Sequence, residues 1–254
     1  MAQDAGAILI GKNTMDQFAT GLNGTRSPNP ICRNAIDPAI IPGGSSSGSA
    51  VAVAADICDF SYGSDTGGSG RVPAAANGIV GFKPTPGLIS ARGMVYCNRS
   101  FDVIPIFAKT IPDVAKVFDV VGGADHLDPF AYQGRLQTLP DVAGTHFAIP
   151  DSLDHFGDRV AQAAHQKNLA ELEKAGATFT EIDFAPFKEA GDLVFQSALV
   201  AERLIDYGDF IESHPDKVVR SVAQAINAGR GFSARDAFEA LPEPAFTSRE
   251  SECP

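Results

Sequence analysis

Two serine-rich clusters carry the residue types that nucleophilic chemistry on a carbonyl group needs. The first, PGGSSSGSAVAVAA, covers residues 42–55, and the second, SDTGGSGR, covers residues 64–71. Ser69 in the second cluster follows Ser45 in the first by 24 residues. Consecutive glycines leave backbone N–H groups open, as an oxyanion hole requires, and a serine at their end is placed to attack. The second cluster therefore has the composition of a nucleophile beside an oxyanion hole.

Each cluster taken alone also has other interpretations. Serines before an apolar run cap helices, each contributing about 1 kcal/mol, and helix N-termini bind anions. The nucleotide-binding pattern GxxxxGK[ST] is absent. Residues 44–48 fit the GxSxG pattern of a hydrolase elbow, with Ser46 as the nucleophile. However, that elbow directly follows a strand, and here Pro42 interrupts the apolar run that precedes it. His214 has no supporting feature as the partner of Ser46. For the second cluster the alternative is a flexible turn.

The elements that would position these clusters are those of an α/β protein. Gly, Pro and helix-capping residues separate apolar runs, some with the spacing of a helix and others with that of a strand. Helices are expected over residues 47–55, 111–121, 158–174 and 186–240, the last with breaks near 214–215 and 229–231, and strands over 7–10, 60–62, 78–82, 146–149 and 178–184. The order strand, helix, strand between residues 146 and 184 favours a mixed or parallel sheet.

Composition excludes several classes of protein. The 254 residues are 44% hydrophobic, and 31 acidic against 20 basic residues give a net charge of −11, the wrong sign for binding nucleic acid through phosphates. No apolar run approaches the roughly 18 residues of a membrane span, and the start lacks signal-peptide features. The four cysteines form no CxxC pair, which favours reduced thiols in the cytoplasm, and the five histidines form no metal-binding motif.

With GIVGFKPTPGLISARG at residues 78–93, the two clusters resemble the amidase signature family. The similarity includes GAILIGKNTMDQFATG, GTRSPNP and RNAIDP, and continues more weakly to about Ala240. It implies an α/β fold in which helices flank a mixed β-sheet core, truncated at both ends and needing no cofactor. The chain would be a single partial amidase domain, with a core over 1–184, a helical region over 185–240 and an unstructured tail over 241–254.

The resemblance also implies roles for the serines. Ser69 matches the nucleophile, and Ser45 matches a second serine that is held by a cis peptide bond and relays a proton to a lysine. The backbone N–H groups of Thr66, Gly67, Gly68 and Ser69 match the oxyanion hole. The family lysine lies upstream of residue 1, whereas Lys12 and Lys83 match family lysines that are not the base. The chain alone is therefore expected to be a feeble or inactive amidase, with a partner chain or a homodimer completing its sheet.

Details of the sequence are most similar to the allophanate hydrolases. Gly70 stands where glutamyl-tRNA amidotransferase catalytic subunits usually have isoleucine, and FQSALVAER at residues 195–203 resembles the segment that holds the substrate carboxylate. Arg203 matches the arginine of that segment, and Phe195 replaces its tyrosine. Without the resemblance, Arg203 would be a surface charge paired with Asp206 or Glu202.

Three functions stay open at this point. The first is hydrolysis of a small amide such as allophanate, for which Arg71 either orients the substrate or anchors its loop. The second is a non-catalytic remnant or scaffold subunit that keeps the fold. The third is a protein similar to the catalytic component of the amidotransferase, which would need a tRNA-binding companion and an ammonia donor.

Overall fold

The computed structural model describes residues 1–136 and 141–240. Its described contacts group into two compact units, one made of residues 1–136 and 194–240 and the other of residues 141–193. The tail expected over residues 241–254 lies outside the described residues, as does Cys253. Both serine clusters and both candidate arginines belong to the first unit.

The first unit is built on a three-stranded antiparallel sheet in the order β1-β3-β2. The central strand β3 (Ile106–Ala108) pairs on one side with β1 (Phe60–Tyr62) and on the other with β2 (Val80–Phe82). Phe60 and Val80 both lie opposite Ala108, so the two outer strands have the same register on β3. In the described part of the chain neither outer strand has a partner on its far side.

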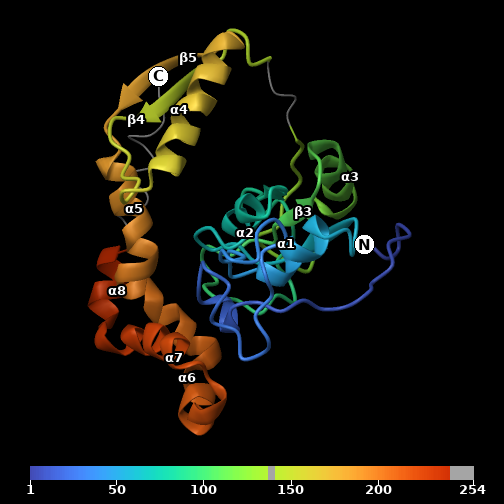
Figure 1. The fold of residues 1–254 in the computed structure, drawn as a ribbon. Helices are drawn as coiled ribbons and strands as arrows, with labels where there is room; N and C mark the ends of the chain where they lie inside the picture. Colours follow the sequence, from blue (N-terminus) through green and yellow to red (C-terminus); the bar gives the residue numbers. More distant parts are fainter. Residues whose placement is uncertain (137–140, 241–254) are drawn as a thin grey trace. The chain divides into compact units, whose positions relative to one another are not determined.

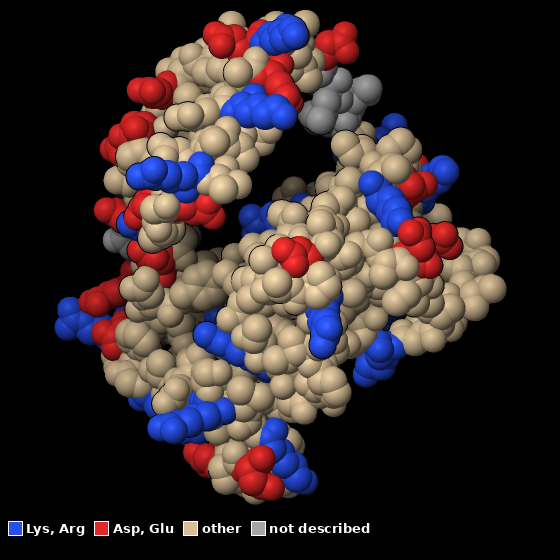
Figure 2. Space-filling view, viewed as in Figure 1, with Lys and Arg blue, Asp and Glu red and all other residues tan. Residues whose placement is uncertain are grey.

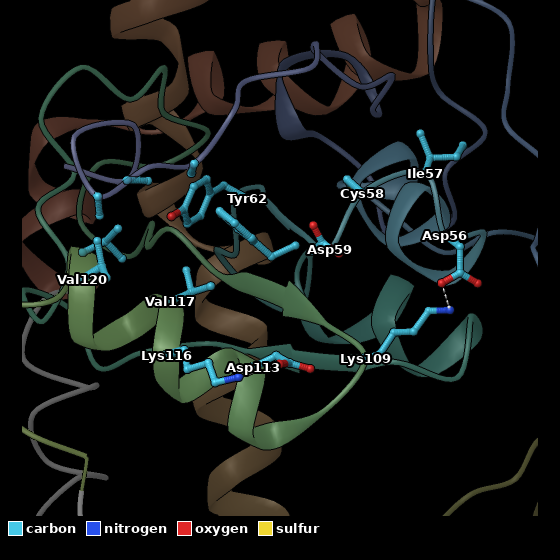
Figure 3. A pocket seen from close by; sticks show the side chains of 15 residues that line it. Asp56, Ile57, Cys58, Asp59, Tyr62, Lys109, Asp113, Lys116, Val117 and Val120 are labelled. Carbon is cyan, nitrogen blue, oxygen red and sulfur yellow. Dashed lines mark ion pairs between the residues drawn. The ribbon is translucent and has the colours of Figure 1, made fainter.

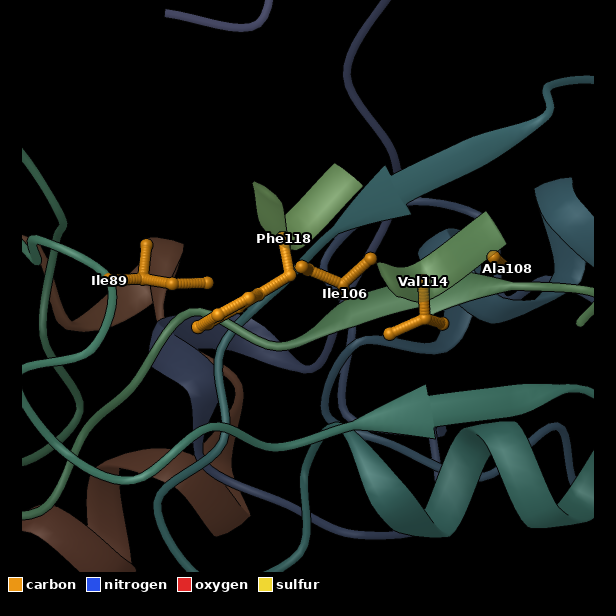
Figure 4. Packing of buried hydrophobic residues seen from close by; sticks show 5 residues of the cluster. All are labelled: Ile89, Ile106, Ala108, Val114 and Phe118. Atoms are coloured by element: carbon orange, nitrogen blue, oxygen red, sulfur yellow. The ribbon is translucent and has the colours of Figure 1, made fainter. Parts of the chain in front are cut away.

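Strand β3 is buried on both faces, and its residues alternate between two cores. Ile106 and Ala108 pack with Val114 and Phe118 of α3 (Ile111–Val121) and with Ile89, as Figure 4 shows. Phe107 points to the opposite face and packs with Ala50, Val53 and Ala74, which belong to two helices. These helices are α1 (Ser47–Ala54) and α2 (Arg71–Ala76). The sheet is therefore the middle layer of the first unit.

The two serine clusters lead directly into these covering helices. The small residues of α1 let it pack closely against β1 and β3, and three of its alanines and valines are almost fully buried. Helix α2 was not predicted. Its Pro73 lies in the first turn, where the missing N–H is no loss to the helix. Both serine clusters are thus anchored at the N-termini of buried helices.

The C-terminal part of the first unit is helical, with breaks at the predicted places. Phe18 stacks on Tyr207 with ring centroids 4.3 Å apart, and the Gln17 side chain bonds the backbone of Lys217 and Val219 at 2.9 and 2.8 Å. These contacts attach the helices to the N-terminal 3-10 turn η1 (Gln17–Ala19). The helical elements are η2 (Ala198–Glu202), α6 (Arg203–Ser213), η3 (Pro215–Lys217), α7 (Arg220–Asn227), η4 (Ala228–Gly231) and α8 (Ala234–Ala240).

The second unit is a strand-helix-strand motif with a parallel pair of strands, drawn in yellow-green to orange in Figure 1. Strands β4 (His146–Pro150) and β5 (Thr178–Ile182) are joined by α4 (Arg159–Lys174), whose N-cap Asp158 accepts bonds from the amides of Val160 and Ala161. Helix α5 (Ala185–Gln196) follows and ends in the first unit. The parallel pair confirms the mixed α/β fold class.

One sequence expectation about the fold is wrong. Residues 7–10 form no strand, and the side chains of Ile8, Leu9 and Ile10 are 86%, 71% and 64% exposed. The physical reason is that an isolated extended segment gains no ladder bonds, and no strand among the described residues pairs with it. Its apolar side chains are therefore left in solvent.

On the face that Figure 2 shows, basic side chains are scattered among acidic ones and form no continuous basic patch. Among the helices of residues 1–136 and 141–240, none is both long enough and apolar enough to cross a bilayer.

Candidate active site

The turn before α1 brings Ser45 into a fully buried position. The Gly44–Ser45 peptide bond is cis, as the family resemblance implies for the relay serine. The Ser45 carbonyl accepts the amide of Asp16 at 2.9 Å, and the Gly44 amide donates to Leu22 O at 2.8 Å. A Cβ at Gly44 would collide with Asp16 Oδ2, so only glycine fits there. The paired glycines of the first cluster thus let the backbone pass close to Asp16.

The carboxylate of Asp16 hydrogen-bonds to the loop of Gly24 and Arg26 that encloses this turn. This role was not predicted from the sequence. The carboxylate accepts the amides of Gly24 at 3.0 Å and Arg26 at 2.7 Å, and the residue has no exposed surface. Burial raises the pKa of Asp16, against the lowering effect of these hydrogen bonds. Asp16 lies within the family-like segment GAILIGKNTMDQFATG, but the segment does not indicate this role, because the partners of Asp16 are backbone groups of a separate loop.

Ser46 of the first serine cluster hydrogen-bonds to the second cluster. Its amide donates to Ser69 O at 3.3 Å, while its hydroxyl donates to Ser64 O and accepts from the Ser64 amide, both at 3.1 Å. Although Ser46 is the N-cap residue of α1, its side chain makes no capping bond. The hydroxyl is therefore committed to the second cluster, which argues against Ser46 as either a helix cap or the nucleophile of a GxSxG elbow.

The buried carboxylate of Asp65 organises the glycine-rich loop of the second cluster. It accepts the amides of Gly68 at 2.7 Å, Gly70 at 3.0 Å and Arg71 at 3.2 Å, and both Nε and Nη2 of Arg71 at 3.0 Å. Burial alone would raise the pKa of Asp65, but the bonds from Arg71, Gly68 and Gly70 outweigh it and hold the pKa below the ordinary value. The loop is therefore a fixed structure and not a flexible turn.

The amide of Gly68 is not available for an oxyanion, contrary to the expectation for this residue. It points at Asp65 Oδ1, because the buried carboxylate needs donors and takes this one. The amides of Thr66, Gly67 and Ser69 have no acceptor among the described residues. Three of the four expected donors thus remain free.

The two serine hydroxyls lie in buried surroundings. Ser45 is fully buried, and its Oγ has no hydrogen-bond partner in the described part of the chain. Ser69 is 3% exposed, and its backbone lies against Ser46, the residue after Ser45. The hydroxyls of Ser47 and Ser64 in the same clusters are also buried without a partner, so Ser45 shares this property with two neighbouring serines.

The two candidate arginines differ in their surroundings. Arg71 donates two bonds to Asp65, and these bonds raise the pKa of its guanidinium. Arg203 is 5% exposed and has neither a hydrogen-bond acceptor nor an ion-pair partner among the described residues. Asp206 pairs instead with Arg99, and Glu202 with Ser100, so the surface-pair interpretation of Arg203 is wrong.

Phe195 connects Arg203 with the glycine-rich loop. The guanidinium of Arg203 lies over the Phe195 ring at 5.9 Å from its centroid, within range of a cation–π contact. The same ring packs so closely on Gly67 that an added Cβ there would collide with Phe195 Cζ. The Phe195 ring thus contacts both the Arg203 guanidinium and the loop at Gly67.

The described lysines do not reach the serines through hydrogen bonds. Lys83 Nζ donates to Pro84 O at 3.3 Å, and burial lowers the pKa of its ammonium group. Lys12 is exposed. In residues 1–136 and 141–240, no group of three or more His, Cys, Asp and Glu side chains is arranged to hold a metal ion.

A cavity of about 520 Å³ lies elsewhere in the first unit and contains none of these residues. Figure 3 shows it between β1 and α3, where Lys109 pairs with Asp56 and Tyr62 forms part of the wall. Its acidic and basic side chains largely neutralise each other, as in the pair of Lys116 with Asp113 at 3.6 Å. Size alone does not make it the reaction site, because the serines and free amides lie outside it.

We expect Asp65→Asn to destabilise the protein by about 2–4 kcal/mol at pH 7, because it removes a buried ion pair and weakens several bonds to the loop. The native pKa of Asp65 is lowered. Its contribution is therefore complete above the unfolded pKa of about 3.9 and is lost as the pH falls through the native value. Urea unfolding of both proteins between pH 7 and pH 3 measures this.

The control is Asp206→Asn, which breaks a similar two-bond pair with Arg99 at the surface. Asp206→Asn should lower the free energy of unfolding much less than Asp65→Asn does. An Asp65→Asn protein as stable as the wild type at pH 7 would contradict the role given to Asp65.

Comparison with known proteins places the chain in a family. Residues 1–237 match the family model described as Amidase. Urea amidolyase of Lachancea kluyveri is 37% identical over 243 residues, which are 94% of this chain and 13% of that protein. A glutamyl-tRNA(Gln) amidotransferase subunit of Geobacillus thermodenitrificans is 42% identical over 194 residues, 73% of this chain and 40% of that one.

Solved structures agree with this assignment. Allophanate hydrolase of Kluyveromyces lactis has a TM-score of 0.89 at 35% identity, covering 98% of this chain and 41% of that one. The chain thus spans less than half the length of each of these relatives. The sequence resemblance is confirmed: the chain belongs to the amidase signature family and is allophanate hydrolase-like.

Proposed function

We propose that this chain carries the serine part of an amidohydrolase that cleaves a small amide bearing a carboxylate, with allophanate as the example. The observation that carries this proposal is Arg203, a buried guanidinium without an anionic partner among the described residues. A buried charge is normally paired, so the natural occupant of this position is an anion from outside the chain. The contacts of Phe195 with both Arg203 and Gly67 support a site in which such an anion binds near the loop of Gly67 and Ser69.

The proposed reaction assigns one task to each serine. A base takes the proton of Ser45 Oγ, which in turn takes the proton of Ser69 Oγ as this oxygen attacks the amide carbon. The free amides of Thr66, Gly67 and Ser69 receive the negative oxygen. The C–N bond then breaks, the nitrogen leaves with the relayed proton as ammonia, and water releases the acyl group from Ser69.

The base in this scheme is a lysine outside residues 1–254. The unpartnered hydroxyl of Ser45 supports this idea, because it lacks the partner that such a base would be. We further propose that a partner chain, which could also carry the lysine, or a second copy of this chain completes the sheet. The free edges of β1 and β2 and the exposed residues Ile8, Leu9 and Ile10 fit that addition. The cytoplasm is the proposed location, with Cys32, Cys58 and Cys97 as free thiols.

A second function is kept because relatives support it. Several glutamyl-tRNA(Gln) amidotransferase subunits are 38–42% identical to this chain over 184–195 residues. The same serine chemistry would there release ammonia from an amide for use by a companion protein. The buried and unpaired Arg203 favours the hydrolase, because it gives the substrate carboxylate a binding partner.

Residues 1–254 alone should release ammonia from allophanate about 10²–10⁴-fold more slowly than a complete allophanate hydrolase, because a general base contributes about that factor. A coupled ammonia assay measures the rate, and Ser69→Ala gives the background. Turnover equal to that of the complete enzyme would contradict the external base. If the chain equals Ser69→Ala even after addition of a lysine-bearing N-terminal segment from a relative, it is a non-catalytic remnant.

Arg203→Met should abolish a preference for malonamate, a carboxylate-bearing amide, over the neutral malonamide. It should leave the free energy of unfolding unchanged or raise it, since an unpaired buried charge is removed. Calorimetric titration and urea unfolding measure the two effects. Arg71→Met is the matched control, because Arg71 is paired with Asp65. Arg71→Met should lose stability and keep the preference for malonamate. If Arg71→Met instead lost the preference and Arg203→Met kept it, the assignment of Arg203 would be refuted.

Phe195→Tyr should tighten malonamate binding roughly 2- to 12-fold, because it adds a hydroxyl donor worth about 0.5–1.5 kcal/mol next to Arg203. The same titration measures the change. Phe187→Tyr, on another exposed ring of α5, is the control. Equal affinities for Phe195→Tyr and the wild type would show that position 195 does not face the carboxylate.

A further inference from the structure

One short segment, residues 96–103, is bonded both to the loop of Ser69 and to the helix of Arg203. We call it the linking segment. Toward the serine loop, Asp102 accepts the Thr66 hydroxyl and the amide of Cys97, the latter at 2.6 Å. Asp65 and Val103 exchange two backbone bonds at 3.0 and 3.1 Å. These contacts fix the first residues of the glycine-rich loop to the linking segment.

Toward Arg203, the linking segment bonds the turn that precedes α6. Asn98, 1% exposed, donates its Nδ2 to Leu199 O at 2.9 Å. Ser100 donates its amide and its hydroxyl to the two carboxylate oxygens of Glu202 at 3.2 and 3.1 Å. Leu199 and Glu202 lie in η2, and Arg203 is the first residue of the helix that follows.

Three further hydrogen bonds join the linking segment to α6 itself. Arg99 forms a two-bond ion pair with Asp206 at 3.1 and 2.5 Å. The Tyr207 hydroxyl donates to Tyr96 O. The linking segment therefore contacts positions on both sides of Arg203 along the chain, which restrains the start of the helix.

We propose that the linking segment is a specificity element of the amide site, with Asn98 as a positioning residue. It sets the place of Arg203 relative to the loop of residues 66–69, so that a carboxylate bound at Arg203 brings the amide carbon to Ser69. This inference rests on the proposed function. A shift of about 1 Å in such an arrangement costs on the order of 10²-fold in rate, so rigid bonding on both sides is functionally useful.

The charge of Asp102 belongs to the same arrangement. Burial raises the pKa of Asp102, while the hydrogen bond from Thr66 and the charge of Arg203 oppose the rise. Among the described residues no ion pair joins Asp102 and Arg203, and the Nε of Arg203 has no acceptor, so this donor is open to a substrate.

The test compares the affinities of residues 1–254 for malonamate and malonamide by calorimetric titration. The readout is the ratio of the two dissociation constants, which requires binding but no catalytic base. Asn98→Leu keeps a similar volume and removes the donor to Leu199, and it should lower the ratio roughly five-fold while malonamide binding stays the same. Ser90→Ala is the control, because among the described residues the Ser90 hydroxyl bonds Asp125, Asp128 and the amide of Arg92 and none of the site residues. It should keep the wild-type ratio.

A double variant covers the case in which Asn98→Leu fails to fold. Arg99→Gln with Ser100→Ala removes the ion pair with Asp206 and the hydroxyl bond to Glu202, and should lower the ratio roughly two- to three-fold. Ratios equal to wild type in the folded variants would overturn the inference and leave the proposed function standing. A wild type that does not distinguish the two amides, and that matches Arg203→Met, would overturn both.

Discussion

The buried carboxylate of Asp65 is the constraint on which the site depends. Placed without any exposed surface, it must be surrounded by donors, and the donors nearest in sequence are the amides of its own loop and the Arg71 fork. Satisfying Asp65 turns the amide of Gly68 inward and leaves those of Thr66, Gly67 and Ser69 without partners among the described residues. The hydrogen bonds that the Asp65 carboxylate requires thus determine which backbone amides remain available to bind an oxyanion.

A second network brings separate parts of the sequence to this loop. Ser46 bonds Ser64 and Ser69, which joins the two serine clusters, and the linking segment joins the same loop to Arg203. The three-layer arrangement of α1, β3 and α3 supports these loops, since β3 is buried on both faces. Within the described part of the chain, the buried polar atoms without a hydrogen-bond partner are the hydroxyls of Ser45, Ser47, Tyr62 and Ser64 and the Nε of Arg203. The proposed reaction assigns a base to Ser45 and a substrate to Arg203.

Much of the fold could be predicted from the sequence because local signals mark it. Thr110 at the N-cap of α3 and Pro112 in its first turn are typical of helix starts, and Asp158 caps α4. The order strand, helix, strand predicted the parallel pair of strands. The positions of Ser45 and Ser69 came from the family resemblance, and their roles stay a proposal. The cis bond at Ser45 lies where the resemblance puts it.

The roles of Asp16, Asp65 and Asp102 could not be read from the sequence. Their partners are backbone amides or side chains brought together only by folding, and no spacing rule links Asp102 to Thr66. The amide of Gly68 was misassigned for the same reason, because the direction of an N–H depends on the carboxylate next to it. The strand expected over residues 7–10 failed because a strand needs a partner, which a local pattern does not contain.

The central claim is that Ser69 is the attacking residue and Ser45 its proton relay. The most direct measurement is to treat the protein, supplemented with the lysine-bearing N-terminal segment of a relative, with a fluorophosphonate, digest it and locate the phosphonylated residue by mass spectrometry. We expect a single adduct on this chain, at Ser69, which forms more slowly in Ser45→Ala. An adduct at Ser46, or labelling of Ser69 at an unchanged rate in Ser45→Ala, would contradict it.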